Sequence, residues 1–117
     1  GLGGNPVVRL KTMLKELLRI AERYPVRAHI AASYDLSIGC HGTTDQLLPM
    51  LREMYGTSRS EGDLRLIGLQ IVAPLYVVFL HAAAFAARGG PNIAERAERE
   101  HAIDTAVDNV VLGTRWR

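Results

Sequence analysis

The chain has 117 residues and a formal net charge of +2, and 48% of its residues are hydrophobic, 22% charged and 6% aromatic. This composition excludes a disordered chain and predicts one globular domain with a modest core. The near balance of charges does not indicate a polyanionic partner, and the scarcity of aromatic residues provides little stacking surface for single-stranded nucleic acid.

Cys40 is the only cysteine, which excludes an intramolecular disulfide and is typical of a reducing compartment. No apolar leader precedes the first charged segment, so we expect a cytoplasmic protein. The sequence begins Gly1-Leu2-Gly3-Gly4 without Met, so residues 1–5 are interpreted as a linker or tag remnant in a fragment of a longer protein. A helical domain is expected over residues 6–113, followed by a tail at 114–117.

Asn5 and Pro6 mark the start of the first predicted helix, because Asn caps free N–H groups and Pro suits the first helical position. Apolar residues then recur every three or four positions until about Arg23: Val7, Leu10, Leu14, Leu17, Leu18 and Ala21. The other face carries a basic stripe, which consists of Lys11, Lys15, Arg19, Arg23 and Arg27. A solvated surface, partly neutralised by Glu16 and Glu22, is the favoured interpretation of this stripe. A face turned toward phosphate or an acidic neighbour is the alternative.

Tyr24-Pro25 ends this helix, and residues 26–38 are expected to form a second one. Its buried side is predicted to contain Ala28, Ile30, Ala31, Tyr34 and Ile38. After a Gly-rich break, Thr43 or Thr44 is expected to cap a third helix that Gly56 ends. Its inward residues are predicted to be Leu47, Leu48, Leu51 and Met54. Pro49 lies inside this pattern and indicates either a kink or a start near Leu48.

Residues 63–88 are expected to form one long helix, because positions 66 to 87 carry no formal charge and the segment is too long for a strand. Such a helix is buried on nearly all sides, yet so short a chain has little core to cover it. A symmetric dimer would cover the second flank, and the many small residues favour close helix packing. A membrane span is the alternative that the length allows, but Gln70, Pro74, His81 and the flanking charges argue against it.

Gly89-Gly90-Pro91 stops this helix, and Asn92 with Glu95 resembles a capping box that opens a last helix over residues 92–112. The later half of this helix is apolar, and Gly113 is predicted to stop it. No segment alternates with a period of two residues, so we expect an all-α fold without a sheet.

Catalytic motifs are not found in the sequence: there is no nucleophile elbow, phosphate-binding glycine loop or paired-carboxylate signature. The four histidines and Cys40 lack the spacing of metal ligands, so no metal, cofactor or enzymatic activity is expected. A small-molecule pocket is the favoured kind of site, and ordinary core packing is the alternative. The expected ligand-binding residues are Met13, His29, Tyr34, Met50, Met54, Gln70, Tyr76 and Phe79.

Three stretches, RLKTMLKELLRIAERYPVRAHIAAS, GDLRLIGLQIVAPLYVVFLHAAAF and AIDTAVDNVVLGT, follow one another in an order found in a known family. With the short helix, polar loop and Gly/Pro break between them, they resemble the C-terminal ligand-binding and dimerisation domain of TetR-family transcriptional regulators. The resemblance spans residues 6–113 and rests on the pattern of elements. It implies a bundle of about five helices whose last two long helices, at 63–88 and 92–112, form a four-helix bundle with their mates in a homodimer.

The resemblance also implies that the earlier helices enclose a pocket for a small apolar or amphipathic effector. The residues expected at the dimer interface are Leu69, Ala73, Val77, Ala83, Ile103, Val107 and Val110. Nothing in this chain corresponds to the N-terminal helix-turn-helix of the family, so the chain is not expected to bind DNA by itself.

The expected function is therefore the effector-binding and dimerisation domain of a bacterial, cytoplasmic TetR-like repressor, with no role at a membrane. Ligand entry is expected to shift the first helix and so change the spacing of two missing DNA-reading heads. Two alternatives remain: a structural dimerisation module without a ligand, and a small helical enzyme that uses His81 or His41 as a base.

Overall fold

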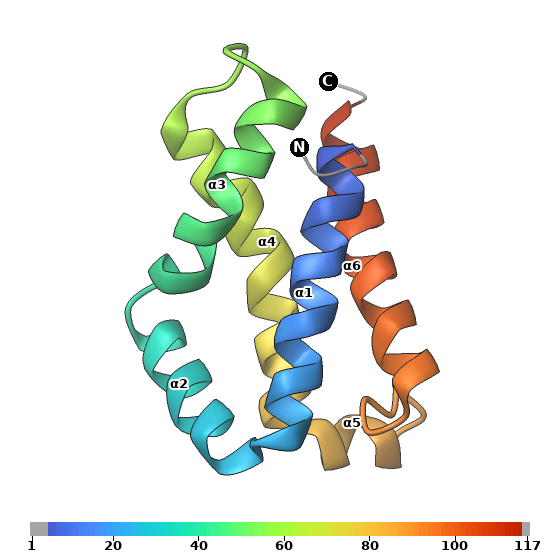
Figure 1. Ribbon diagram of the computed structural model, residues 1–117. Coiled ribbons are helices and arrows are strands. Elements are labelled where there is room, and N and C mark those ends of the chain that lie inside the picture. The colour runs from blue at the N-terminus through green and yellow to red at the C-terminus, as the bar shows by residue number, and fades with distance from the viewer. Residues whose placement is uncertain (1–4, 116–117) are drawn as a thin grey trace.

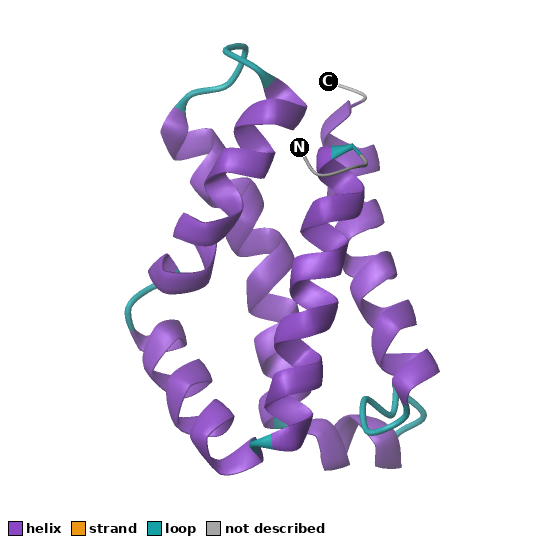
Figure 2. Cartoon of the chain, in the orientation of Figure 1, coloured by secondary structure: helices purple, strands orange, loops and turns teal. Residues whose placement is uncertain are grey.

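A computed structural model describes residues 5–115, so residues 1–4 of the expected linker and residues 116 and 117 lie outside its described part. The described chain forms six helices and no strand (Figures 1 and 2), which confirms the predicted all-α class. The helices are α1 (Pro6–Arg23), α2 (Pro25–Ser37), α3 (His41–Tyr55), α4 (Glu61–Leu80), α5 (Ala82–Ala87) and α6 (Arg96–Arg115).

The central helix of the bundle is α4, which packs against α2, α3, α5 and α6. Helix α1 packs against α2, α3 and α6, but along their described lengths no Cα atom of α1 lies within 8 Å of a Cα atom of α4. The backbones of these two helices therefore do not approach each other closely. The main core includes Leu10, Leu47, Ile71 and Ile103, and a smaller cluster of Ala21, Ala32, Phe79 and Ile93 lies apart from it.

Helix α1 begins and ends at the predicted residues. Asn5 Oδ1 accepts a hydrogen bond from the backbone N–H of Val8 at 2.9 Å, and Pro6 occupies the first turn. Leu10, Leu14 and Ala21 are buried as predicted. The local capping signal was sufficient here, because the capping side chain and the N–H group that donates to it are only three residues apart.

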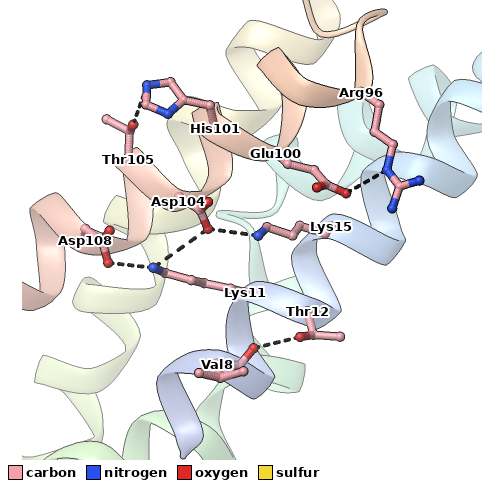
Figure 3. A network of polar contacts seen from close by, with 10 residues as sticks. All are labelled: Val8, Lys11, Thr12, Lys15, Arg96, Glu100, His101, Asp104, Thr105 and Asp108. Atoms are coloured by element: carbon pink, nitrogen blue, oxygen red, sulfur yellow. Dashed lines mark hydrogen bonds and ion pairs between the residues drawn. The ribbon is translucent and has the colours of Figure 1, made fainter.

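Two residues of the basic stripe hold α1 against α6 (Figure 3). Lys11 Nζ lies 2.8 Å from Asp108 Oδ1 and Lys15 Nζ lies 3.0 Å from Asp104 Oδ1. The solvated-surface interpretation is thus wrong for these two lysines, which face an acidic neighbour in the same chain. The sequence pattern could not show these partners, because the carboxylates belong to a helix about 90 residues further along the sequence. Arg19 forms an ion pair with Glu16 within α1, which agrees with the predicted neutralisation of part of the stripe by Glu16.

Helix α2 is rotated relative to the prediction. Its buried residues are Ala32 and Asp35, whereas Ile30 is 68% exposed and Tyr34 is 66% exposed. With Val26 and Ile38, which are also exposed, these residues form the α2 apolar stripe on the outer face. The expected burial was therefore wrong for Ile30, Ala31, Tyr34 and Ile38. The contacts of the Asp35 carboxylate turn another face of the helix inward.

Helix α3 begins at His41, earlier than predicted, and Cys40 at its N-cap has a left-handed backbone with φ 62°. Thr43 and Thr44 are not the caps. Instead Asp35 accepts hydrogen bonds from the backbone N–H groups of Gly42 and Thr43. Pro49 lies within the continuous helix, so a start near Leu48 was wrong, and Gly56 ends the helix as predicted.

The predicted long helix is divided at His81 into α4 and α5. Ser60 caps α4 by accepting from Asp63 N–H at 3.1 Å. The Ala-rich α5 has no fully buried residue, and it turns across the end of the bundle (Figure 1). Among the described helices, α4 alone is long and apolar enough to cross a membrane by length and composition. Its central place among other helices provides a second reason for that composition.

Helix α6 begins at Arg96, four residues after the predicted start, and continues past Gly113 to Arg115. Asn92 forms a turn instead of a helix cap: its Oδ1 accepts from Ala94 N–H and its own N–H donates to Glu98. Buried Arg99 donates to the carbonyl of Ile93 at 2.9 Å, which keeps the turn folded against the helix. At the other end, Arg59 donates to the carbonyl of Thr114 in the last turn of α6.

Gly68→Ala is expected to lower the free energy of unfolding by about 1 kcal/mol, although Ala favours helices over Gly by roughly that amount. A Cβ atom at this position would lie 2.9 Å from Thr44 Cγ2 at the tight contact between α3 and α4. Gly62→Ala is the matched control in the same helix, because its Cβ would meet only Ser60 Oγ at 3.8 Å. Urea denaturation should show a neutral or stabilised Gly62→Ala variant. Stabilisation of both variants would mean that α3 and α4 are less closely packed than described.

Candidate functional site

An apolar cleft of about 480 Å³ lies between α1, α2 and α4. Its size falls within the range of roughly 300–1,000 Å³ found for small-molecule sites. Four residues with polar or charged groups line it: Tyr24, Arg27, Thr43 and Tyr76. The remaining walls are apolar and comprise Leu14, Leu17, Leu18, Ile20, Ala21, Ala28, Ala31, Ala32, Val72, Leu75 and Phe79.

The cleft arises from side-chain size. The inner face of α2 presents Ala28, Ala31 and Ala32, whose short side chains leave space in front of α1 and α4. Phe79 closes one part of the wall and is itself held by His29, whose ring centroid lies 4.8 Å away at an angle of 55°. Leu17 and Leu18, which belong to the predicted apolar face of α1, line this cleft.

One end of the cleft contains a network of hydrogen bonds around Asp35. The Tyr76 hydroxyl donates to Asp35 Oδ2 at 2.6 Å and lies 2.5 Å from Thr43 Oγ1, which is therefore the donor of that pair. The backbone N–H of Gly42 donates to Asp35 Oδ1 at 2.8 Å, and that of Thr43 donates to Oδ2 at 3.2 Å. Asp35 is only 8% exposed, and both of its oxygens are occupied. The network thus links the cleft to the first turn of α3.

The same contacts determine the protonation states at this end. Burial opposes ionisation of Asp35, but the hydrogen bonds from Tyr76, Gly42 and Thr43 outweigh it and lower the pKa of the carboxyl group. Burial and the bond to Asp35 raise the pKa of the Tyr76 hydroxyl well above its usual range. Burial and the charge of Asp35 also raise the pKa of the Cys40 thiol. At neutral pH this end of the cleft therefore holds one carboxylate and a neutral hydroxyl donor, with a protonated thiol beside Asp35.

The other end of the cleft carries Arg27, the only charged residue among those that line it. Arg27 lies in the first turn of α2, is exposed, and makes no ion pair with the described residues. Its neighbour Arg23 does not line the cleft but lies over the ring of Tyr24, with 5.7 Å between the guanidinium carbon and the ring centroid. The cleft is therefore electrostatically asymmetric, with a cation at the α1–α2 corner and a carboxylate near α3.

The structure brings two of the predicted ligand-binding residues, Tyr76 and Phe79, together in the cleft. His29 contacts Phe79 without lining the cleft, and Tyr34 belongs to the α2 apolar stripe. Met13, Met50 and Met54 pack against the main core, and Gln70 is exposed beside α6. Sequence reasoning missed Arg27, Thr43 and the alanines of α2. Three small residues on one side of a helix were the available signal, but they resemble any close helix contact.

The predicted interface residues are dispersed over α4, α5 and α6. Leu69, Ala73 and Val110 are partly buried, and Val77 is 41% exposed on the outer flank of α4. Ala83 is exposed on α5, whereas Ile103 and Val107 lie completely inside the core of this chain and have no surface for a partner. A groove of about 580 Å³ runs between α4 and α6, and its lining includes Pro74, Val78, Ala102 and Ala106.

Comparison with protein-family models, curated proteins and solved structures finds no match for this chain. Within the described residues, no three His, Cys, Asp or Glu side chains lie close enough together to hold a metal ion. His41 and His81, the bases of the alternative enzymatic hypothesis, are both exposed and line neither the cleft nor the α4–α6 groove.

Proposed function

We propose that this chain is the effector-binding and dimerisation domain of a bacterial TetR-like transcriptional regulator and that the α1–α2–α4 cleft is its effector site. The observation that carries the proposal is the cleft itself: apolar walls with a few polar groups at the two ends. The order of helices, with a central apolar helix and a last long helix beside it, supports the same proposal. DNA would be bound only by a helix-turn-helix domain attached before α1.

Helix α1 is the element through which ligand occupancy would act. Five of the cleft residues belong to it, and no close backbone contact fixes its distance from α4. The Lys11 and Lys15 ion pairs join it to α6, so a movement of α1 is transmitted to that helix as well. In the proposed mechanism, a ligand that separates α1 from α4 changes the spacing of two DNA-reading domains in a dimer.

We place the dimer interface on the joint outer surface of α4 and α6. Val77 and Leu66 are exposed on α4, although both are large apolar residues. Ala73, Ala102 and Ala106 have short side chains that allow another helix pair to approach closely. Of the predicted interface residues, Leu69, Ala73, Val77 and Val110 remain in this proposal. A homodimer of this kind has a twofold axis, so each interface residue occurs twice in the interface, once from each copy.

Ala28→Trp is expected to fill the cleft and to weaken binding of an apolar fluorescent probe at least tenfold. Anilinonaphthalene sulfonate is the probe, and its fluorescence enhancement measures the affinity. Ala86→Trp, on the exposed face of α5, is the matched control and should bind as the unsubstituted chain does. The probe should also raise the melting temperature of the unsubstituted chain, because a ligand of the native state stabilises it by mass action.

Two results would contradict the proposed site. The first is an unsubstituted chain that neither enhances the probe's fluorescence nor melts at a higher temperature with it. The second is equal binding by Ala28→Trp and Ala86→Trp while circular dichroism shows both variants folded. A dimer without probe binding would favour the structural module over the effector domain.

A further inference from the structure

The charges of the cleft lie at opposite ends of one helix. Arg27 and Asp35 are eight residues apart on α2, which corresponds to about 12 Å along a helix axis. Arg27 lines the cleft directly, and the hydroxyl of Tyr76 lies between the cleft and Asp35. Apolar side chains occupy the intervening walls. A ligand that extends along the cleft thus meets a positive charge at one end and a buried negative charge behind the other.

The end near Asp35 is unsuited to a charged ligand of either sign. Both carboxylate oxygens already accept hydrogen bonds, one from Gly42 and the other from Thr43 and Tyr76. An ammonium group would have to displace these donors, two of which belong to the first turn of α3. An anionic group would be repelled by the carboxylate in a poorly hydrated site. This end therefore favours an apolar group with at most a hydrogen bond to Thr43 or Tyr76.

The α1–α2 corner is suited to an anion. Arg27 has no ion-pair partner among the described residues, and neither does its neighbour Arg23. With Glu22, these residues supply two cations and one carboxylate at the corner. Arg19, one turn earlier, is already paired with Glu16. An acidic head group could thus bind Arg27 without breaking an existing ion pair, and its guanidinium could hold a carboxylate with two parallel hydrogen bonds.

We propose, on the basis of the effector site proposed above, that the ligand is an elongated apolar acid. Its anionic head group binds Arg27 at the α1–α2 corner, and its apolar body lies between α1 and α4 with its far end near Tyr76. Arg27 is then the residue that determines the sign of charge which the site accepts.

Three probes with the same apolar chain and different head groups test this proposal: dodecanoate, dodecanol and dodecyltrimethylammonium, each below its micelle-forming concentration. Calorimetric titration of the unsubstituted chain should show the tightest binding for dodecanoate and the weakest for the ammonium compound. Arg27→Gln should weaken dodecanoate binding about three- to tenfold, the effect of one partly exposed ion pair, and leave dodecanol binding unchanged. Arg23→Gln is the matched control and should alter dodecanoate binding less than about twofold.

The outcomes separate the head-group assignment from the site itself. Equal binding of dodecanoate and dodecanol, with no effect of Arg27→Gln, would overturn the assignment of Arg27 while the cleft remains a site. Preference for the ammonium probe would reverse the proposed polarity. Dodecanoate binding that persists in Ala28→Trp would place the acid outside the cleft and overturn the proposal. Failure of all three probes, together with failure of the fluorescent probe, would contradict the effector site as well.

Discussion

Asp35→Ala is expected to lower the free energy of unfolding by about 3 kcal/mol, a large fraction of the stability of a domain this size. The substitution removes one acceptor from three donors: the Tyr76 hydroxyl and the backbone N–H groups of Gly42 and Thr43. Each donor lies in a partly buried place where water replaces the lost bond poorly, and two of them belong to the first turn of α3. Urea denaturation followed by circular dichroism measures the change.

Asp45→Ala, on the neighbouring helix α3, is the control for loss of a carboxylate. Asp45 is exposed and lies 2.7 Å from Arg65 across the surface, so its removal should cost at most about 1 kcal/mol. If Asp35→Ala costs no more than Asp45→Ala, the hydrogen bonds around Asp35 do not stabilise the fold in the way that their geometry indicates.

The pH dependence of the stability of Asp35→Asn, compared with the unsubstituted chain, tests whether the charge of Asp35 contributes to these contacts. The hydrogen bonds lower the pKa of Asp35 in the folded chain, below the value of about 3.9 in an unfolded one. The ionised group therefore contributes its full stability above about pH 4, and this contribution is lost as the pH falls through the lowered folded pKa. The advantage of the unsubstituted chain over Asp35→Asn should shrink on acidification below pH 4. A constant difference across that range would mean that Asp35 is not ionised in the folded chain.

Several local signals predicted helix ends correctly, although the Asn92 cap and the Gly113 stop did not. Asn5 and Pro6 predicted the start of α1, and Gly56 predicted the end of α3, since each acts on its own helix terminus. The predicted start of α3 was wrong because the acceptor for the N–H groups of its first turn is Asp35, which belongs to the preceding helix. The prediction of the buried face of α2 was wrong because it also depends on the contacts of Asp35 with other helices. Hydrophobicity alone favoured burial of Ile30 and Tyr34, while the buried carboxylate lies on the opposite face.

The candidate site was harder to predict because a cleft is defined by distances between helices. Choosing large, adaptable side chains selected Tyr76 and Phe79, which line the cleft, but also Met13 and Met50, which are partly buried against the main core. The space itself is left by Ala28, Ala31 and Ala32, and a small residue in a sequence predicts close packing as readily as an opening. Arg27 was assigned to a general basic stripe, since nothing local separates it from Lys11 and Lys15. Only the packing of α1 on α6 shows that those lysines have partners.

Val77→Glu is expected to convert the proposed dimer into monomers, with the dissociation constant raised about a thousandfold or more. The symmetric interface would contain two unpaired carboxylates, one from each copy, at roughly 2 kcal/mol or more apiece. Val77 is 41% exposed in the single chain, so Glu can reach water once the copies separate. The monomer should therefore keep its helical circular dichroism. Sedimentation equilibrium over a range of concentrations measures the dissociation constant.

Ile30→Glu provides the matched comparison, because the α2 apolar stripe is a second exposed apolar face and Ile30 is 68% exposed on it. The proposed interface on α4 and α6 predicts that Ile30→Glu remains a dimer. Dissociation of Ile30→Glu with an intact Val77→Glu dimer would move the interface to α2, directly beside Arg27 and the cleft. In that arrangement, a ligand at the α1–α2 corner would act on the partner copy through α2, and the spacing mechanism assigned to α1 would have to be replaced.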